Sequence, residues 1–182
     1  HERQAYRYFV GNGIPKLVER LAPADQRTPA VLEAALADFK RDYGQHLRDT
    51  TAPYPGIPEM LAKLKANGVQ LAVFSNKADA LAKEVVKDYF GTQYFTIVRG
   101  QMTGVAPKPA AAGTNALLQA LHADPASTLY VGDSNVDVET AHNANLPCCG
   151  AVWGFRTREE LNAAGAEYLA ENSDELYDVI MK

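Results

Sequence analysis

Short apolar runs alternate with stretches of helical periodicity from residue 53 to the C-terminus. Such runs predict buried strands, and they are residues 71–74, 95–98, 129–131, 148–152 and 168–169. The helical patterns between them cover residues 58–66, 78–89, 111–121, 136–144, 158–163 and 174–180. Strands that alternate with helices pair in parallel through right-handed crossovers, and continuously apolar strands are covered on both faces. The pattern therefore predicts a doubly wound, Rossmann-like, mostly parallel α/β sheet over residues 53–182.

The first 52 residues carry a different pattern. Apolar side chains recur there at three- and four-residue intervals, which is the spacing of one face of a helix. They are Val18, Leu21, Val31, Leu32, Ala35, Leu36 and Phe39. Strand patterns are absent from this stretch. We therefore expect an all-helical region over residues 1–52.

Composition and charge narrow the classes of function. The chain has 182 residues, which suits one domain or a core with a small insertion. Its net charge of −4 gives no basic footprint for nucleic acid. Its apolar runs fall short of the roughly 20 residues that span a bilayer. We expect a cytoplasmic monomer or homodimer that acts on a small molecule, with no nucleic-acid or membrane partner.

Polar residues follow the predicted strands, where sites on parallel sheets lie. Ser75-Asn76-Lys77 comes after the first strand and before a helix. A hydroxyl and backbone amides at such a turn bind anions, because the start of a helix presents unpaired N–H groups. Alternatively, Ser75 or Asn76 merely caps the helix.

Two carboxylates follow the third predicted strand, in Gly132-Asp133-Ser134-Asn135-Val136-Asp137. They lie four residues apart across a strand end and a helix start, so both can face one point. Hard oxygen ligands of this type suit Mg²⁺. The alternative is that Asp137 only stabilises the start of the helix. Gly132 would allow a close approach of the backbone.

Lys108-Pro109 precedes another predicted helix. Proline suits the first position of a helix, which would place Lys108 at its mouth. Such a lysine either neutralises a bound phosphate and bridges carboxylates, or it is an ordinary surface lysine.

Taken in order, Phe74-Ser75-Asn76, Lys108-Pro109 and the segment from Gly132 to Asp137 resemble the second, third and fourth motifs of the haloacid-dehalogenase superfamily. Further segments are similar to its phosphoglycolate phosphatase branch. These are Tyr54-Pro55-Gly56-Ile57-Pro58-Glu59-Met60-Leu61, Ser75-Asn76-Lys77, Tyr130-Val131-Gly132-Asp133-Ser134 and Trp153-Gly154-Phe155-Arg156. The resemblance implies that residues 1–52 are part of an all-α cap and residues 53–182 the α/β core.

The resemblance also implies a role for each motif residue. Ser75 would donate its hydroxyl to the phosphoryl group, with the backbone N–H of Asn76 helping. Lys108 would neutralise the phosphoryl group and the nucleophile. Asp133 would bind Mg²⁺ directly, and Asp137 would hold either a metal-bound water or Lys108.

Substrate specificity would come from the cap and from basic residues near the site. The segment Gly11-Asn12-Gly13 would form a loop that closes over the leaving group of the substrate. Lys77 and Arg156 would meet a substrate carboxylate. The alternative for both is a flexible surface charge.

One expected motif is missing from the sequence. The superfamily's first motif, Asp-x-Asp-Gly-Thr, follows a strand in the middle of the sheet, and its aspartates are the nucleophile and the general acid/base. Without that strand the two flanking strands would keep unpaired backbone groups. We expect that the biological polypeptide is longer and includes this motif. A genuine truncation, inactive and poorly folded, is the alternative.

The resemblance implies a hydrolase of carbohydrate metabolism. It would cleave phosphomonoesters with Mg²⁺ through an aspartyl-phosphate, and 2-phosphoglycolate or a similar small anionic phosphate is the expected substrate. Two alternatives stay open. One is a sugar-phosphate mutase or pyrophosphatase of the same superfamily, and the other is a non-catalytic phosphate-binding fragment.

Overall fold

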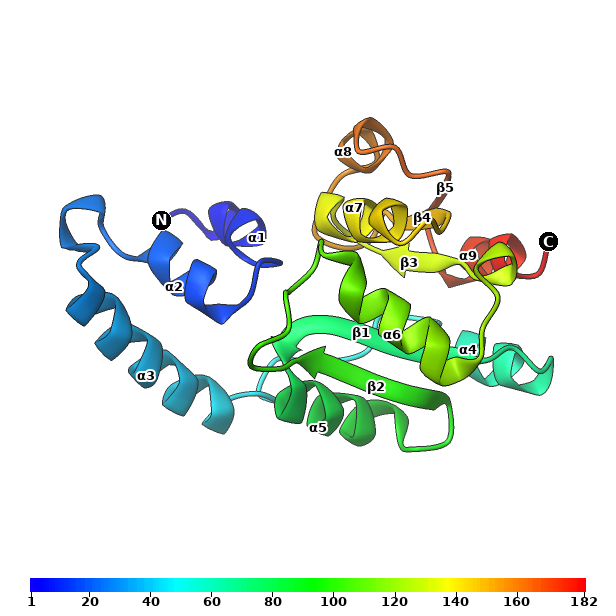
Figure 1. The fold of residues 1–182 in the computed structure, drawn as a ribbon, viewed down its shortest axis with the longest axis horizontal. Helices are drawn as coiled ribbons and strands as arrows, with labels where there is room; N and C mark the ends of the chain where they lie inside the picture. Colours follow the sequence, from blue (N-terminus) through cyan, green and yellow to red (C-terminus); the bar gives the residue numbers. More distant parts are fainter.

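The computed structural model describes residues 1–182, with the side chain of Arg3 left out. Strands and helices alternate from residue 57 to the C-terminus, so the predicted α/β class is confirmed (Figure 1). In chain order the elements are α4 (Ile57–Ala66), β1 (Leu71–Ala78), α5 (Asp79–Phe90), β2 (Phe95–Gln101), α6 (Ala111–Leu121), η3 (Pro125–Ser127), β3 (Tyr130–Gly132), α7 (Asn135–Asn143), β4 (Cys148–Ala151), α8 (Arg158–Ala163), β5 (Tyr168–Ala170) and α9 (Ser173–Ile180).

The five strands form two parallel sheets rather than one. β1 pairs with β2, and β4 lies between β3 and β5. The edge strands β1 and β3 both line a cavity of about 860 Å³, whose walls are mostly apolar. Its lining includes Leu71, Phe74, Phe95, Leu129 and Val131. A sheet without its central strand would have this arrangement, because the two flanking strands would face each other across the gap.

β1 is longer than the apolar pattern predicts. The expected strand stops at Phe74, whereas the observed one continues to Ala78. Phe74 is opposite Arg99 and Ala78 is opposite Gln101, so the ladder is irregular between them. The segment 75–77 therefore bulges from the strand. Its polar side chains end the apolar pattern, so the sequence did not indicate that the strand continues. A bulge leaves such residues without a partner in the ladder.

Two apolar clusters hold the α/β region together. One packs α6, α7 and α8 around β4 through residues that include Leu118, Val138, Cys148 and Leu161. The other packs α4 and α9 against β4 and β5. Both cysteines are free and buried. Burial raises the pKa of Cys148 to about 12, so this thiol stays protonated and serves as a core residue.

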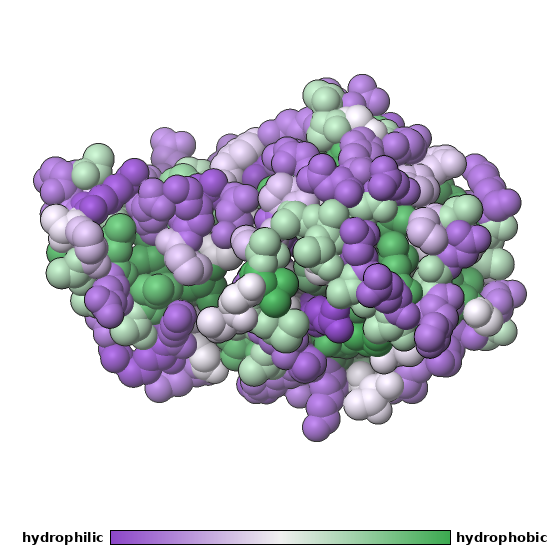
Figure 2. Space-filling model, viewed as in Figure 1, coloured by the Kyte–Doolittle hydropathy of each residue, from purple (hydrophilic) through white to green (hydrophobic). Residues whose placement is uncertain are grey.

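Residues 1–52, called the helical region below, contain helices and turns, as their periodicity predicts. The elements are η1 (Arg3–Ala5), α1 (Tyr6–Phe9), α2 (Ile14–Leu21), η2 (Ala24–Gln26) and α3 (Pro29–Gln45). Gly13 precedes α2 with a φ of 86°, a conformation that glycine adopts at low cost. Hydrophobic residues gather between α2 and α3 (Figure 2). Of the helices that the structure describes, none is long and apolar enough to cross a membrane.

Truncating the core around β4 should destabilise the protein. Leu161 is fully buried in the first cluster. We predict that Leu161→Ala lowers the free energy of unfolding by about 2–5 kcal/mol, because the cavity it leaves cannot fully collapse. Urea denaturation followed by circular dichroism measures this. The control is Val31→Ala, a residue 43% exposed, which should change stability by less than about 0.5 kcal/mol. Equal effects of the two substitutions would contradict the assignment of this core.

Candidate active site

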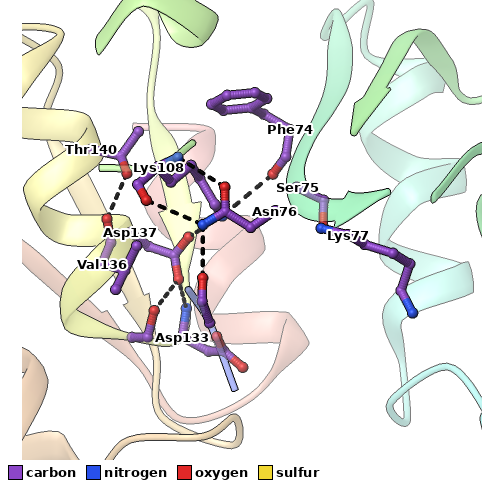
Figure 3. Close-up of polar contacts among 11 residues, drawn as sticks. Phe74, Ser75, Asn76, Lys77, Lys108, Asp133, Val136, Asp137 and Thr140 are labelled. Carbon is purple, nitrogen blue, oxygen red and sulfur yellow. Dashed lines mark hydrogen bonds and ion pairs between the residues drawn. The ribbon is translucent and has the colours of Figure 1, made fainter. Parts of the chain in front are cut away.

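The predicted motif residues meet where β1 and β3 end. Ser75 and Asn76 come from β1, and Lys108 comes from the segment between β2 and α6. Asp133 directly follows β3, and Asp137 lies in the first turn of α7. Figure 3 shows the side chains of Asn76, Lys108 and Asp137 close together, with the backbone N–H of Asp133 directed at Asp137. Parallel strands bring their carboxyl ends to one edge of the fold, so residues distant in the sequence converge.

A buried ion pair lies at the centre of this cluster. Lys108 Nζ donates to Asp137 Oδ1 at 2.6 Å, and the two side chains are only 12% and 9% exposed. Asp137 Oδ2 accepts the Ser134 hydroxyl at 2.6 Å and the Asp133 backbone N–H at 3.2 Å. Of the two roles expected for Asp137, the structure shows the contact with Lys108.

Two glycines let the carboxylates come this close to the backbone. A Cβ on Gly132 would overlap the side chain of Asp137, and a Cβ on Gly154 would overlap that of Asp133. The expected close approach at Gly132 is therefore made by Asp137, a side chain of the chain itself. Gly154, in the turn after β4, has the same function for Asp133.

Burial and neighbouring charges set the protonation of the cluster. The pKa of Asp133 is raised, first by burial and then by the negative charge of Asp137. Burial by itself would lower the pKa of Lys108, but the charge of Asp137 and the neighbouring Tyr130 hydroxyl together outweigh burial, and the pKa is raised overall. Lys108 therefore keeps its positive charge in a place that water reaches poorly.

The carboxylates are compatible with a divalent metal ion held by few protein ligands. Among the described residues, no three His, Cys, Asp or Glu side chains are grouped to hold a metal. Mg²⁺ commonly takes one or two carboxylates and completes its shell with water and substrate phosphate. Asp133 would be the better direct ligand, because Asp137 is bonded to Lys108 whereas Asp133 Oδ2 only accepts the Phe155 N–H at 3.2 Å. A cation beside Asp133 would counteract its raised pKa, because it favours the ionised carboxylate.

Neither Ser75 nor Asn76 caps the following helix. The N-cap of α5 is Ala78, and no side chain bonds to that helix end. The Ser75 hydroxyl accepts the backbone N–H of Lys77 at 3.1 Å, and the Asn76 side chain is buried with partners outside α5. Capping is thus the wrong alternative for both residues.

Lys108 lies slightly further from a helix start than predicted. α6 begins at Ala111 after the N-cap Ala110, so Pro109 is not its first residue. The side chain of Lys108 points into the cluster and is mostly buried, which is inconsistent with an ordinary surface lysine.

The loop Gly11-Asn12-Gly13 lies beside this cluster. The carbonyl of Gly11 accepts a bond of 2.7 Å from the Asn76 side chain. Asn12 Oδ1 accepts from Arg20 of α2 at 2.9 Å. Asn12 and Gly13 also line a pocket of about 580 Å³ between α2, α3 and the segment after β2. The structure therefore brings this loop next to the motif residues.

Lys77 and Arg156 have partners in the helical region. Lys77 Nζ donates to the Tyr43 hydroxyl and lies 4.5 Å from the centre of that ring. Figure 3 shows it pointing away from the other motif residues. Arg156 donates to the carbonyl of Arg7 at 2.6 Å and stacks on the ring of Tyr8. A role of either residue toward a substrate carboxylate stays a prediction.

Some site residues escaped the sequence analysis. The Tyr130 hydroxyl is buried near Lys108 without a hydrogen bond of normal geometry, and burial raises its pKa to about 12. Arg20, Tyr8 and Tyr43 contact the predicted residues from the helical region. Tyr130 belongs to an apolar strand pattern, so its polar end gave no separate signal. The other three contacts depend on how the two regions dock.

Comparison with known proteins identifies the family independently of the site geometry. Residues 1–151 match the family described as haloacid dehalogenase-like hydrolase. A phosphoglycolate phosphatase from Neisseria meningitidis is 33% identical over 150 residues, which are 81% of this chain and 64% of the relative. One from Mesorhizobium japonicum is 30% identical over 159 residues, 86% of this chain and 70% of the relative. The chain thus spans less than two thirds of the length of the Neisseria relative.

Solved structures agree with these matches. A candidate phosphoglycolate phosphatase from Lactobacillus delbrueckii superposes with a TM-score of 0.92 at 26% identity. The superposition covers 99% of this chain and 83% of that chain. The structure of a protein from Haemophilus somnus superposes with a TM-score of 0.89 at 22% identity. That superposition covers 98% of this chain and 82% of the other, and at this identity it supports the fold alone.

The close packing of Gly154 on Asp133 can be tested by adding one methyl group. We predict that Gly154→Ala lowers the free energy of unfolding by about 1–3 kcal/mol, because the new Cβ collides with a partly buried carboxylate. Thermal and urea denaturation measure this. Gly44→Ala is the control, since a Cβ there meets nothing within 4 Å and alanine favours the helix. Gly154→Ala as stable as the parent protein would contradict the packing described.

Proposed function

Because the chain belongs to the haloacid dehalogenase-like hydrolase family, as its motifs predicted, we propose that it forms most of the active site of a Mg²⁺-dependent phosphomonoesterase. The proposed substrate is 2-phosphoglycolate or a similar small anionic phosphate. The observation that carries the proposal is the buried Lys108–Asp137 pair beside Asp133 at the carboxyl ends of the strands. The names of the relatives support the choice of substrate.

Lys108 has the donors that a phosphoryl group requires. Its ammonium carries three N–H bonds. One points to Asp137 at 2.6 Å, and a second, long contact reaches the carbonyl of Phe74 at 3.5 Å. The third N–H, beside the Tyr130 hydroxyl, would bind a phosphoryl oxygen. The Ser75 hydroxyl and the Asn76 backbone N–H would bind the other oxygens, so that positive charge and donors surround the group being transferred.

Asp133 would hold the Mg²⁺ ion, which when bound offsets charge on the phosphoryl oxygens. Asp137 keeps Lys108 charged and oriented through the bond at 2.6 Å. Ser134 and the Asp133 backbone fix Asp137 in turn. The four groups act together, because the position of each carboxylate depends on donors from its neighbours.

The attacking carboxylate is proposed to lie on a strand between β1 and β3. Both edge strands line the cavity there, and a parallel strand would join the order β5-β4-β3 to β1-β2. In the proposed reaction, one aspartate on that strand attacks phosphorus and the bond to the leaving alcohol breaks. A second aspartate gives the alcohol its proton. It then takes a proton from water, which attacks the aspartyl-phosphate and releases phosphate and the carboxylate.

The helical region is proposed to be the cap that selects the substrate. Its loop at residues 11–13 and the pocket of about 580 Å³ would surround the leaving group. The N–H groups at the start of α2 are candidates to meet a carboxylate. Lys77 and Arg156 could do so only after leaving Tyr43 and Tyr8, their present partners.

The metal assignment makes a direct prediction. Asp133→Asn should abolish Mg²⁺-dependent release of phosphate from 2-phosphoglycolate, because a neutral amide binds the ion poorly. The assay uses the chain together with the segment that carries the attacking aspartate. Asp174→Asn, on the exposed start of α9, is the control and should keep full activity. Full activity of the Asp133 variant would remove the metal assignment.

The same assay separates the proposed reaction from its alternatives. A phosphatase releases inorganic phosphate from a phosphomonoester. A mutase would return an isomerised sugar phosphate, and a pyrophosphatase would require a diphosphate substrate. The absence of any turnover by the unaltered protein would favour a non-catalytic phosphate-binding role.

Lys108 should be essential for the rate of the proposed reaction, unlike an ordinary surface lysine. We predict that Lys108→Ala lowers kcat by about 100-fold or more, because positioned charge on the phosphoryl group is the main catalytic contribution in phosphoryl transfer. Phosphate release under saturating substrate measures this. Lys65→Ala, an exposed lysine near the end of α4, should leave kcat unchanged. An unaltered rate for the Lys108 variant would show that its ion pair is structural only.

A further inference from the structure

We infer that Asn76 is a positioning residue that holds Lys108 in place and couples the position of Lys108 to the loop at Gly11. The catalytic consequence of this inference rests on the proposed function, whereas the coupling itself does not. The inference uses the side chain of Asn76, which is separate from the backbone N–H expected to bind phosphate.

The carboxamide of Asn76 joins three segments of the chain. Its Oδ1 accepts the backbone N–H of Lys108 at 2.8 Å. Its Nδ2 donates to the carbonyl of Lys108 at 3.2 Å and to the carbonyl of Gly11 at 2.7 Å. The side chain is 8% exposed, so these bonds are made away from water. Both backbone groups of Lys108 thus pair with one side chain, which in turn bonds to the helical region.

Lys108 lies in a segment that regular structure does not hold. Residues 102–110 connect β2 to α6 without helix or strand. Few bonds fix the segment near the lysine, among them Ala110 N–H to Pro107 at 2.9 Å and Asn143 to the carbonyl of Pro109 at 2.9 Å. The position of the Lys108 backbone therefore depends strongly on Asn76. Its ammonium must still reach Asp137 at 2.6 Å, so a small backbone shift would misplace the charge.

The loop at residues 11–13 completes this arrangement. The bond from Asn76 to Gly11 is made to a backbone carbonyl, so it depends on the position of the loop and not on the side chains of the loop. Arg20 of α2 fixes the neighbouring Asn12 at 2.9 Å and the carbonyl of Phe9 at 2.9 Å. When the loop is docked, Asn76 has all three partners. When the loop moves away, one buried donor of Asn76 loses its partner, and the bonds to Lys108 are left to fix the carboxamide alone.

The chemistry of the site requires an amide at this position. Two carbonyl oxygens and one N–H face the side chain, so it must donate twice and accept once. Aspartate would still accept the Lys108 N–H, but its other oxygen would face two carbonyls. Serine is too short to bridge three segments, and alanine removes all three bonds. An unpaired buried group is costly, so the docked loop and the ordered lysine segment stabilise each other.

Amide hydrogen exchange followed by NMR tests the coupling directly. We compare the parent chain with Asn76→Ala, Asn76→Asp and the control Asn143→Ala, which removes one amide-to-carbonyl bond from the same segment. Asn76→Ala should speed exchange of the Lys108 N–H by at least about tenfold, because its acceptor is lost, and should also speed exchange in α2. Asn143→Ala should change both by less than about twofold.

Asn76→Asp separates the two halves of the inference and replaces Asn76→Ala if that variant does not fold. Because the carboxylate still accepts from Lys108, this N–H should remain protected, whereas exchange in α2 should rise. Unchanged exchange at Lys108 in Asn76→Ala would overturn the positioning role. Faster exchange at Lys108 with an unchanged α2 would overturn the coupling to the loop.

Kinetics supply the second measurement. Asn76→Ala should lower kcat by about 10–100-fold while KM changes less than about threefold, because a misplaced lysine affects the transition state more than binding. Asn143→Ala should match the parent protein. Loss through KM alone would overturn the positioning role. If the parent protein shows no phosphatase activity, the proposed function fails, while the exchange data still decide the coupling.

Discussion

The buried pair of Lys108 and Asp137 is the interaction on which the surrounding structure depends. Taking two charges out of water is costly unless their remaining hydrogen-bonding groups also find partners. Asp137 meets this requirement through Ser134 and the Asp133 backbone, whereas the Lys108 ammonium has a further, long contact of 3.5 Å with the Phe74 carbonyl. The arrangement explains why strand ends, a helix start and an irregular segment come together at one point. It also explains the glycine at position 132, where any Cβ would overlap Asp137.

The gap between the two sheets also lies beside this ion pair. β1 and β3 carry residues of the cluster at their carboxyl ends, yet they belong to different sheets. Apolar side chains of both strands line the cavity between the sheets. A strand placed there would supply the missing backbone partners and would end beside Lys108 and Asp133. Completing the sheet and completing the active site are therefore one event in the proposed enzyme.

Three contacts between the helical region and the α/β region are made by residues at or just after strand ends. Lys77 meets Tyr43, Arg156 meets Tyr8, and Asn76 meets the loop at Gly11. In two of these contacts a cation lies over an aromatic ring, which stabilises docking without a charge partner. Since all three residues lie near the cluster, movement of the helical region would alter the surroundings of the proposed phosphate site. The proposed role of this region in selecting the substrate depends on these contacts.

The sequence alone predicted the α/β class, the approximate bounds of the strands and helices after residue 53, and the residues that meet in the central cluster. These follow from local patterns, since periodicity reports burial and residues after strands must lie at one edge of the sheet. The choice between the two roles of Asp137, the bulge at residues 75–77, and the partners of Lys77 and Arg156 came only from the tertiary structure. Each depends on how distant segments dock, and the free energy of docking is spread over many contacts that no short pattern contains. The three bonds of Asn76 belong to the same class, because they join residues 65 and 32 positions apart in the chain.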